Sequence, residues 1–318
     1  MLWRKVSTQW SEVGCKGGSS CVASWCQTPR MSNSPLVPTV RRRRLGSTLR
    51  RLRNAAGLTL DDAAEQMGWK APKMSKIENA TQSIRPTEVA ELLQAYGVTD
   101  PEVHAALESL ARDAGKRGWW QTYSGVLAPA YSDYISLESD AARICEWSPL
   151  VIPGLLQTAS YARETITGMT LSRTADEIAA LAEVRQARQA VLTRPGNPLE
   201  FWAIIHEAAL HQRFAVRPGT MRDQLRRLLD VAELRNITLQ IMPLDSTAHP
   251  GLQGGFSLVS FPGPTPDVVL LENLSGATYV EGDDTSPFAG AVERIRATAL
   301  SVDDSLARIK DMEEGQSK

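Results

Sequence analysis

One glycine and the small and apolar residues spaced around it constrain this chain most strongly. Within Thr59 to Glu78, Ala64 stands four residues before Gly68, and Met74 and Ile77 follow that glycine by six and nine. Gly68 can adopt the left-handed conformation that ends a helix in a tight turn, and Ala64 is small enough for a second helix to cross closely. Met74 and Ile77 share one helical face and can pack back onto the first helix. This register predicts two helices joined by a tight turn.

The second helix of the pair is left with a short polar and basic face once its apolar positions are buried. That face is made of Pro72, Lys73, Ser75 and Lys76, and it holds no carboxylate. A helix held in this way by its partner can lie in the major groove of DNA, which is wide enough to admit it. The alternative is an ordinary helical hairpin whose lysines are only solvated.

Three further helices flank the pair and predict a compact all-α bundle between residues 40 and 115. Apolar residues recur there at helical spacing, at Leu45, Leu49, Leu52 and Ala56, at Val89, Leu92, Leu93 and Tyr96, and at Val103, Leu107 and Leu110. Gly57 ends the first of these stripes, and Asp100 followed by Pro101 is a typical start for the last. With these flanks, DNA binding is favoured over a solvated hairpin.

From Val40 to Ala114 the chain resembles the Cro and phage-repressor type of DNA-binding domain, the Xre family. Helix order, the turn glycine and the terminal Ile77-Glu78-Asn79 fall in the register of that family. The resemblance implies a five-helix helix-turn-helix bundle whose third helix, about Ala71 to Glu78, enters the major groove. It places Ala71, Pro72 and Lys76 over base edges, with Lys73 near a phosphate. Because Ala71 and Pro72 cannot donate to bases, readout is expected to rest on Lys76.

The resemblance also implies an ion pair from Arg53 to Glu78 that ties the first helix to the end of the third. Three positions depart from the family pattern, one of them Leu60, which replaces the glutamine that often touches phosphate at the start of the second helix. Lys70 stands at the N-cap of the third helix, where Ser or Thr is usual, and Ala80 replaces the usual glycine after Glu78 and Asn79. We expect Asn79, which tolerates the left-handed conformation, to end the helix instead.

Charge divides the chain into a basic and an acidic part. Residues 36–118 hold 14 Lys and Arg against 10 Asp and Glu, a net of +4, whereas residues 119–318 hold 17 against 25, a net of −8. A protein that touches a polyanion at one end only has such a distribution. The run Arg41, Arg42, Arg43 and Arg44 precedes Leu45, the first apolar position predicted for the bundle. The run is either a solvated tail or a basic arm along the DNA backbone, and its place beside the bundle favours the arm.

Residues 118–318 are long enough for a second domain, and their mixed periodicity predicts an α+β fold. Helices are expected at 137–146, 155–168, 175–193, 220–235 and 289–312, the last as one long or broken helix. Strands are expected at 199–205, 238–242, 256–261 and 268–271. No repeat with a period of about 20 to 50 residues is present, so a repeat array is not expected.

Four segments of this region carry a further pattern: Arg117–Trp120, Leu137–Ala141, Val151–Thr158 and Tyr161–Arg163. They resemble the uncharacterised domain that follows an Xre-type bundle in many actinobacterial regulators. Such regulators are described as antitoxin-like and are often encoded beside a small protein of another uncharacterised family. The resemblance implies regulation and names no ligand. Within the first segment, Trp119 and Trp120 either cap a ligand pocket or pack the joint between the domains, and packing is favoured.

No recognisable catalytic or metal-binding constellation stands out in the sequence. His206 and His211 are five residues apart, whereas the zinc protease motif needs i, i+4 spacing to place both imidazoles on one helix face. Gly251, Gly254 and Gly255 lack the Lys-Ser/Thr of a phosphate loop and precede a strand, so they predict a hairpin or bulge. We therefore expect no enzymatic activity, no metal site and no cofactor.

The first 35 residues predict a disordered extension. Cys15, Cys21 and Cys26 fit no common zinc spacing, and no long apolar run provides a signal peptide or membrane anchor. Met31 begins a polar lead-in typical of true starts, so residues 1–30 also fit an over-extended reading frame. We expect a cytoplasmic protein that makes no membrane contact.

The sequence thus predicts a transcription regulator that binds double-stranded DNA through one domain and an effector or partner protein through the other. One bundle of this size buries only about 600 to 1,000 Å² on DNA, which is usually too little to select one operator. A homodimer formed by residues 119–318 is therefore expected. Two other classes stay open: an antitoxin-like module that neutralises a small neighbour-encoded partner and controls its own operon, and an enzyme hidden in the second domain.

Overall fold

The computed structural model describes residues 39–114, 118–170, 172–214, 216–263, 265–274 and 276–315. The extension predicted over residues 1–35, with Cys15, Cys21 and Cys26, lies outside these ranges. Among the described residues, no helix combines the length and the apolar character needed to cross a membrane.

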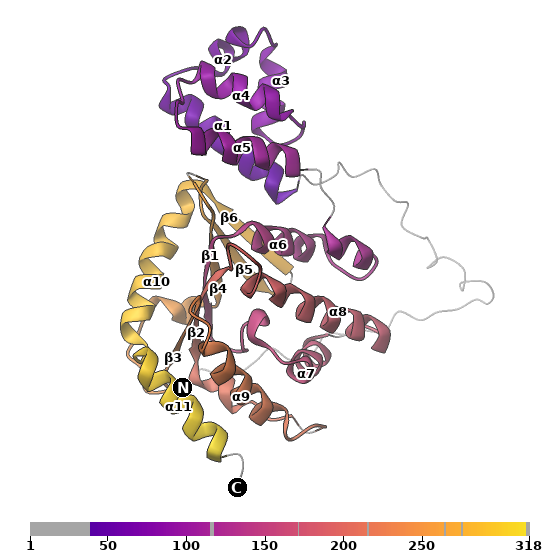
Figure 1. The fold of residues 1–318 in the computed structure, drawn as a ribbon, viewed down its shortest axis with the longest axis vertical. Helices are drawn as coiled ribbons and strands as arrows, with labels where there is room; N and C mark the ends of the chain where they lie inside the picture. The colour runs from indigo at the N-terminus through magenta and orange to yellow at the C-terminus, as the bar shows by residue number, and fades with distance from the viewer. Residues whose placement is uncertain are drawn as a thin grey trace, which may run out of the picture. The chain divides into compact units, whose positions relative to one another are not determined.

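Five helices form an N-terminal bundle, so the all-α prediction for this region is confirmed (Figure 1). They are α1 (Val40–Ala55), α2 (Leu60–Gln66), α3 (Ala71–Glu78), α4 (Pro86–Ala95) and α5 (Pro101–Asp113). Thr59 starts α2 with a capping box: the Thr59 hydroxyl accepts from the Asp62 backbone N–H, and the Asp62 carboxylate accepts from the Thr59 backbone N–H. Gly68 has a φ of +63°, which permits the tight turn between α2 and α3.

The core of the bundle consists of the apolar residues that recur at helical spacing. It includes Leu45, Leu49, Ala63, Ala64, Met74, Ile77, Val89, Leu92, Leu93 and Leu107. Burial of the small Ala63 and Ala64 lets α3 cross close to α2, and Met74 and Ile77 fill the space between them. Helix α3 therefore has one face fixed inside the bundle and one face left outside.

The second domain is built on a mixed six-stranded sheet, so the α+β prediction is confirmed as well. Its strands are β1 (Arg143–Ser148), β2 (Glu200–His206), β3 (Ile237–Met242), β4 (Phe256–Ser260), β5 (Val268–Asn273) and β6 (Gly276–Glu281). They lie in the order β3-β2-β1-β4-β5-β6. Strands β1, β2 and β3 are parallel, while β4 is antiparallel to β1, β5 to β4, and β6 to β5.

Helices cover both faces of this sheet (Figure 1). They are α6 (Pro129–Asp140), α7 (Ala159–Met169), α8 (Ala175–Arg188), α9 (Thr220–Ala232), α10 (Ser286–Thr298) and α11 (Val302–Gly315). Side chains of α6, α7, α9 and α11 bury one face, as with Leu137 of α6 against Ile144 of β1. Val292 and Ile295 of α10 pack on the opposite face with Cys145 of β1. Short 3-10 segments connect these elements: Trp119–Tyr123, Gly154–Leu156, Gln189–Leu192, Glu207–His211, Pro250–Gln253 and Gly282–Thr285.

Two strands differ from the sequence prediction. The expected helix at 137–146 is wrong in its second half, because α6 ends at Asp140 and β1 follows from Arg143. Strand β1 is central in the sheet, and its neighbours β2 and β4 lie more than fifty residues away, so no local pattern announces it. Strand β6 was also not expected; it forms a hairpin with β5, in which Asn273 pairs with Gly276. The predicted hairpin or bulge at Gly251 to Gly255 is instead a 3-10 turn, Pro250–Gln253.

Candidate nucleic-acid interface

Helix α3 presents the predicted polar face outside the bundle. Pro72 and Lys76 are exposed, while Ala71, Lys73 and Ser75 are half-buried. No side-chain hydrogen bond caps its N-terminus at Lys70, but a proline in the first turn removes one unsatisfied backbone donor. The structure thus brings all five candidate residues of this helix onto one short segment.

The end of α3 is tied to α1 by a buried ion pair. Nε and Nη2 of Arg53 donate to the two carboxylate oxygens of Glu78 at 2.7 and 3.0 Å, and Nη1 donates to the Leu58 carbonyl at 2.8 Å. This hydrogen bonding with Glu78 raises the pKa of Arg53. Arg50 adds a 3.2 Å hydrogen bond to the same carboxylate and one of 2.6 Å to Asn79. The only carboxylate of α3 is therefore neutralised on the side away from the exposed lysine.

Sequence reasoning did not anticipate the role of Gly46, which lets α1 approach α3. A Cβ at this position would lie 2.6 Å from the carbonyl oxygen of Glu78 and 2.8 Å from that of Ile77. Both are backbone atoms that cannot move away easily, so only glycine fits. The available signal was a glycine on the buried side of a helix, next to Leu45 and before Leu49.

The expectation that Asn79 ends α3 in the left-handed conformation is wrong. Asn79 has φ −89° and ψ 9°, and the left-handed residue is Ala80, with φ +60°. Ala80 thus occupies the glycine position of the family pattern with glycine-like backbone angles, although its Cβ makes them unfavourable. The Asn79 side chain instead donates to Ser75 Oγ at 3.2 Å and supports the last turn.

The two lysines at the centre of α3 have different surroundings. Lys76 is exposed, and its ammonium group has no partner among the described residues. Lys73 donates to Glu88 Oε1 at 2.9 Å and lies 3.5 Å from the centre of the Trp69 ring. Burial alone would raise the pKa of Glu88, but hydrogen bonds from Arg85 and Lys73 bring it down to about 2. Lys76 can therefore meet DNA directly, whereas Lys73 must leave a carboxylate to do so.

The four arginines before Leu45 lie at the start of α1, and three of them, Arg41, Arg43 and Arg44, contact the second domain. Arg41 donates to both carboxylate oxygens of Asp140 at 2.7 Å, and Arg43 donates to Glu281 at 3.2 Å. Arg44 is buried, and its guanidinium lies 3.2 Å from the centre of the Phe261 ring. Arg42 is half-buried. Their assignment to DNA stays a prediction, and contact with a phosphate would require Arg41 and Arg43 to leave these carboxylates.

Helix α1 begins at Val40, inside the range 40–115 predicted for the bundle, and its first residue packs on the second domain. Val40 is fully buried and belongs to the core of the second domain, where it packs with Tyr134 and Leu137 of α6. The arginine run is therefore part of α1 and not an arm preceding the bundle, and the sequence did not show that Val40, ahead of Leu45, is buried. The physical reason is that the apolar partners of Val40 lie about a hundred residues further along the chain, beyond the reach of a periodicity argument.

Comparison with known families agrees with the two-part organisation. A family model described as "Domain of unknown function (DUF5753)" matches residues 131–311, more than half of the 318-residue chain. The chain belongs to the DUF5753 family. A second model, described as "Helix-turn-helix domain", matches residues 44–107 of this DUF5753 protein. Neither the curated proteins nor the solved structures contain a match to it.

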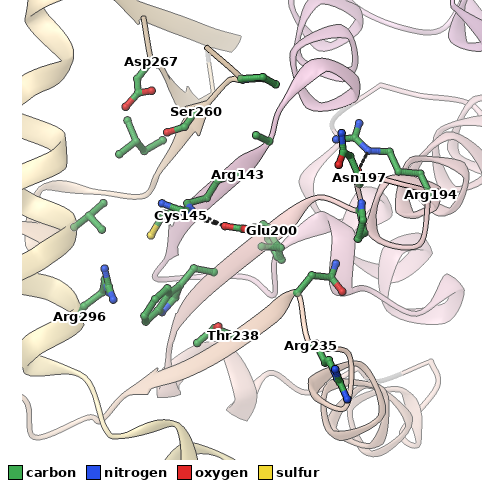
Figure 2. Close-up of a pocket in the computed structure, with 18 of the residues that line it drawn as sticks. Arg143, Cys145, Arg194, Asn197, Glu200, Arg235, Thr238, Ser260, Asp267 and Arg296 are labelled. Carbon is green, nitrogen blue, oxygen red and sulfur yellow. Dashed lines mark hydrogen bonds and ion pairs between the residues drawn. The ribbon is translucent and has the colours of Figure 1, made fainter. Parts of the chain in front are cut away.

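The DUF5753 domain has a pocket of about 940 Å³ on the sheet face beside α10 (Figure 2). Three of its arginines contact other groups of the protein. Arg143 pairs with Glu200 at 2.7 Å, and Arg296 lies 3.5 Å from the centre of the Trp202 ring. Arg194 donates to the carbonyl oxygens of Ser139 and Ala141 at 2.7 and 2.6 Å. The pocket is therefore a charged groove over the part of the sheet that α10 leaves open.

Other residues weighed from the sequence have structural contacts in the DUF5753 protein. His206 Nδ1 accepts from the Ala208 backbone at 3.1 Å and caps the 3-10 segment that contains His211. Trp120 is buried with Leu127, Ile135 and Val184 and packs a 3-10 turn onto α6 and α8, whereas Trp119 is exposed. This packing lies inside the second domain and not at the joint between the two domains, which was the favoured interpretation.

Proposed function

We propose that the protein is a cytoplasmic, sequence-specific transcription regulator of the Xre type, in which α3 enters the major groove of DNA. The observation that carries the proposal is the outer face of α3: Lys76 is exposed and unpaired among the described residues, while the carboxylate of the helix is held by arginines on its inner side. A cation on a helix of this kind can approach a polyanion without first breaking a contact. We assign no catalytic activity, metal or cofactor to the protein.

Base readout in this proposal rests on a few atoms. The Lys76 ammonium can donate to O6 and N7 of guanine, the acceptors that this base presents in the major groove. Ala71 and Pro72 offer apolar contact to thymine methyl groups, and the Ser75 hydroxyl can donate or accept. Lys73 reaches a phosphate once it leaves Glu88. Phosphate contacts position the helix, whereas Lys76 specifies the sequence.

The second domain, in this proposal, pairs two copies of the chain. Three exposed leucines support this role: Leu150 follows β1, Leu244 follows β3, and Leu252 precedes β4. Since β1 and β3 are parallel and β4 starts beside the end of β1, the three leucines lie at the edge of the sheet where β1 and β3 end and β4 begins. Exposed leucines gathered at one edge are typical of a surface that binds another protein. Two bundles joined in this way would read half-sites about one helical turn apart.

Selection of binding sites from genomic DNA, followed by footprinting on the best site, tests the proposal. We expect the full chain to protect two half-sites related by a near-palindrome, and sedimentation to give the mass of a dimer. Replacing Leu150 and Leu252 by serine should return the mass to that of one chain and shorten the footprint. Absence of any preferred site would contradict sequence-specific DNA binding.

The same leucine edge also favours a second candidate function, that of an antitoxin-like module. In that case the edge binds a small partner protein encoded beside this chain, and DNA binding controls the operon of the pair. Co-expression with the neighbouring genes separates the two proposals. A stable complex with a small protein that is lost on replacing Leu150 and Leu252 would favour the antitoxin-like function, and a homodimer of the same chain would favour the regulator alone.

A further inference from the structure

Arg44 is a buried cation that stacks on the Phe261 ring but makes no side-chain hydrogen bond to the part of the chain that the structure describes. Its side chain is only 4% exposed, and neither Nε nor Nη1 has a hydrogen-bond partner among the described residues. The nearest carboxylate oxygen, Oδ2 of Asp140, lies 3.9 Å from Nη1, and both oxygens of Asp140 already accept from Arg41 at 2.7 Å. Burying a charge without such bonds is costly, so an orphaned guanidinium indicates a missing acceptor.

A cavity of about 320 Å³ adjoins this guanidinium. It lies between α5 of the bundle and the loop after β4, and Arg44, Asp113 and Asp140 are its charged lining residues. Apolar groups supply most of the remaining wall: Ala105, Ala106, Leu110, Phe261 and Pro262. The hydroxyls of Ser109 and Thr265 complete it. A volume of this size, with apolar walls and a few converging polar groups, suits a small molecule.

The lining selects a chemical class of ligand. A guanidinium binds a carboxylate with two parallel N–H···O bonds along one of its edges. Burial lowers the pKa of Arg44 to about 10, so the group still carries its charge at neutral pH. Asp113 and Asp140 in the same wall would repel a polyanion such as a polyphosphate. A single carboxylate on a compact apolar body therefore fits better than a multiply charged ligand.

We propose that this cavity is an effector site for a small monocarboxylate, whose carboxylate binds Arg44 and whose apolar body lies against α5 and Phe261. The effect of this ligand on DNA binding rests on the proposed function. The ligand would touch the DNA-binding bundle and the second domain at once. By holding α1 and α5 to the loop after β4, it would change how readily the bundle adjusts to DNA. A ligand that binds the two arrangements with different affinity shifts their equilibrium.

Calorimetric titration of the full chain with acetate, isobutyrate and benzoate tests the site. We expect at least one carboxylate to bind with a millimolar or tighter Kd, and its neutral amide to bind more weakly. Arg44→Gln should weaken that binding about 10- to 100-fold, since it removes a charged hydrogen-bond donor. Ala106→Leu, which fills the cavity from α5 without altering Arg44, should weaken it as well. The control Arg43→Gln changes a neighbouring arginine that does not line the cavity and should leave the affinity unchanged.

Two results would overturn the proposal: no binding of any of the three carboxylates, or binding that neither Arg44→Gln nor Ala106→Leu weakens. A DNA titration with and without the bound carboxylate then addresses regulation. Calorimetry needs no DNA, so failure of the protein to bind DNA would remove the proposed function while leaving the ligand site standing. Conversely, DNA binding without carboxylate binding would remove the ligand site alone.

Discussion

Two basic segments of the bundle carry similar charge and have very different surroundings. On α3, Lys76 is exposed and unpaired among the described residues. At the start of α1, Arg41 is bound by both oxygens of Asp140, and Arg44 is buried against Phe261. The number of charges in a segment therefore does not tell which of them a polyanion can reach. Carboxylates far along the chain decide this, and they leave α3 as the accessible basic surface.

The strongest way to test the importance of paired charges is to remove the most buried carboxylate of the bundle. Glu78→Ala should lower the free energy of unfolding by about 3–5 kcal/mol, because Arg53 stays buried without its partner. Urea unfolding followed by circular dichroism measures this. The control Glu91→Ala, on an exposed position of α4, should change stability by less than about 0.5 kcal/mol. Similar small losses for both variants would show that the ion pair does not hold α1 to α3.

A smaller loss is expected where the arginine run meets the second domain. Asp140→Ala removes both carboxylate acceptors of Arg41, which keeps only its weaker 3.3 Å bonds to the Asp113 carbonyl and Ser139 Oγ, and the nearest carboxylate to Arg44. The free energy of unfolding should fall by about 1–3 kcal/mol, the usual cost of leaving a buried polar group unpaired. Lys76→Ala serves as the exposed counterpart and should change it by less than about 0.5 kcal/mol. Equal effects of the two substitutions would remove the distinction between the basic segments.

Lys73 lies between these extremes, and releasing it sharpens the comparison. Glu88→Gln weakens its ion pair, so Lys73 becomes available to a phosphate. The slope of log K against log salt concentration for DNA binding should then become steeper by about 1, the contribution of about one phosphate contact. Lys73→Ala in the same background should restore the original slope. An unchanged slope in Glu88→Gln would mean that Lys73 gains no phosphate when this carboxylate is removed.

The same carboxylate gives stability a defined pH dependence. The folded-state pKa of Glu88 is about 2, below its ordinary value of 4.5, so the unfolded chain takes up this proton first as the pH falls. The stabilisation is therefore complete above pH 4.5 and is lost as the pH drops towards 2. Glu88→Gln should lower stability at neutral pH and converge with the parent protein near the acid end. A stability difference that persists unchanged across this range would exclude titration of Glu88 as its cause.

The bundle could be predicted from the sequence because its signals are local. The positions of Ala64, Gly68, Met74 and Ile77 follow from helix period and turn geometry alone. The left-handed conformation of Ala80 could not be predicted in this way. Residue preference favours Asn79, and only the surrounding backbone decides which residue adopts the left-handed conformation. The clash that makes Gly46 necessary exists only once α3 is in place.

Neither the contacts of the arginine run nor the central strand of the sheet could be predicted from the sequence, because in both cases the partners lie far away along the chain. Arg41 and Asp140 are separated by 99 residues, and β1 receives its hydrogen bonds from β2 and β4 much later in the chain. Periodicity within a window of residues carries no information about such partners. The helix-turn-helix face was therefore accessible to sequence reasoning, whereas the roles of Arg41, Arg43 and Arg44 were not.

The most direct measurement compares the two basic segments on DNA. Fluorescence anisotropy with the preferred site and its single-base variants would be recorded for the parent chain, Lys76→Ala and Arg43→Gln. We expect Lys76→Ala to cost about 1–3 kcal/mol on the preferred site and to flatten the ranking of the variants, while Arg43→Gln keeps the ranking. An unchanged ranking in Lys76→Ala, or its loss in Arg43→Gln, would contradict the assignment of α3 as the reading helix.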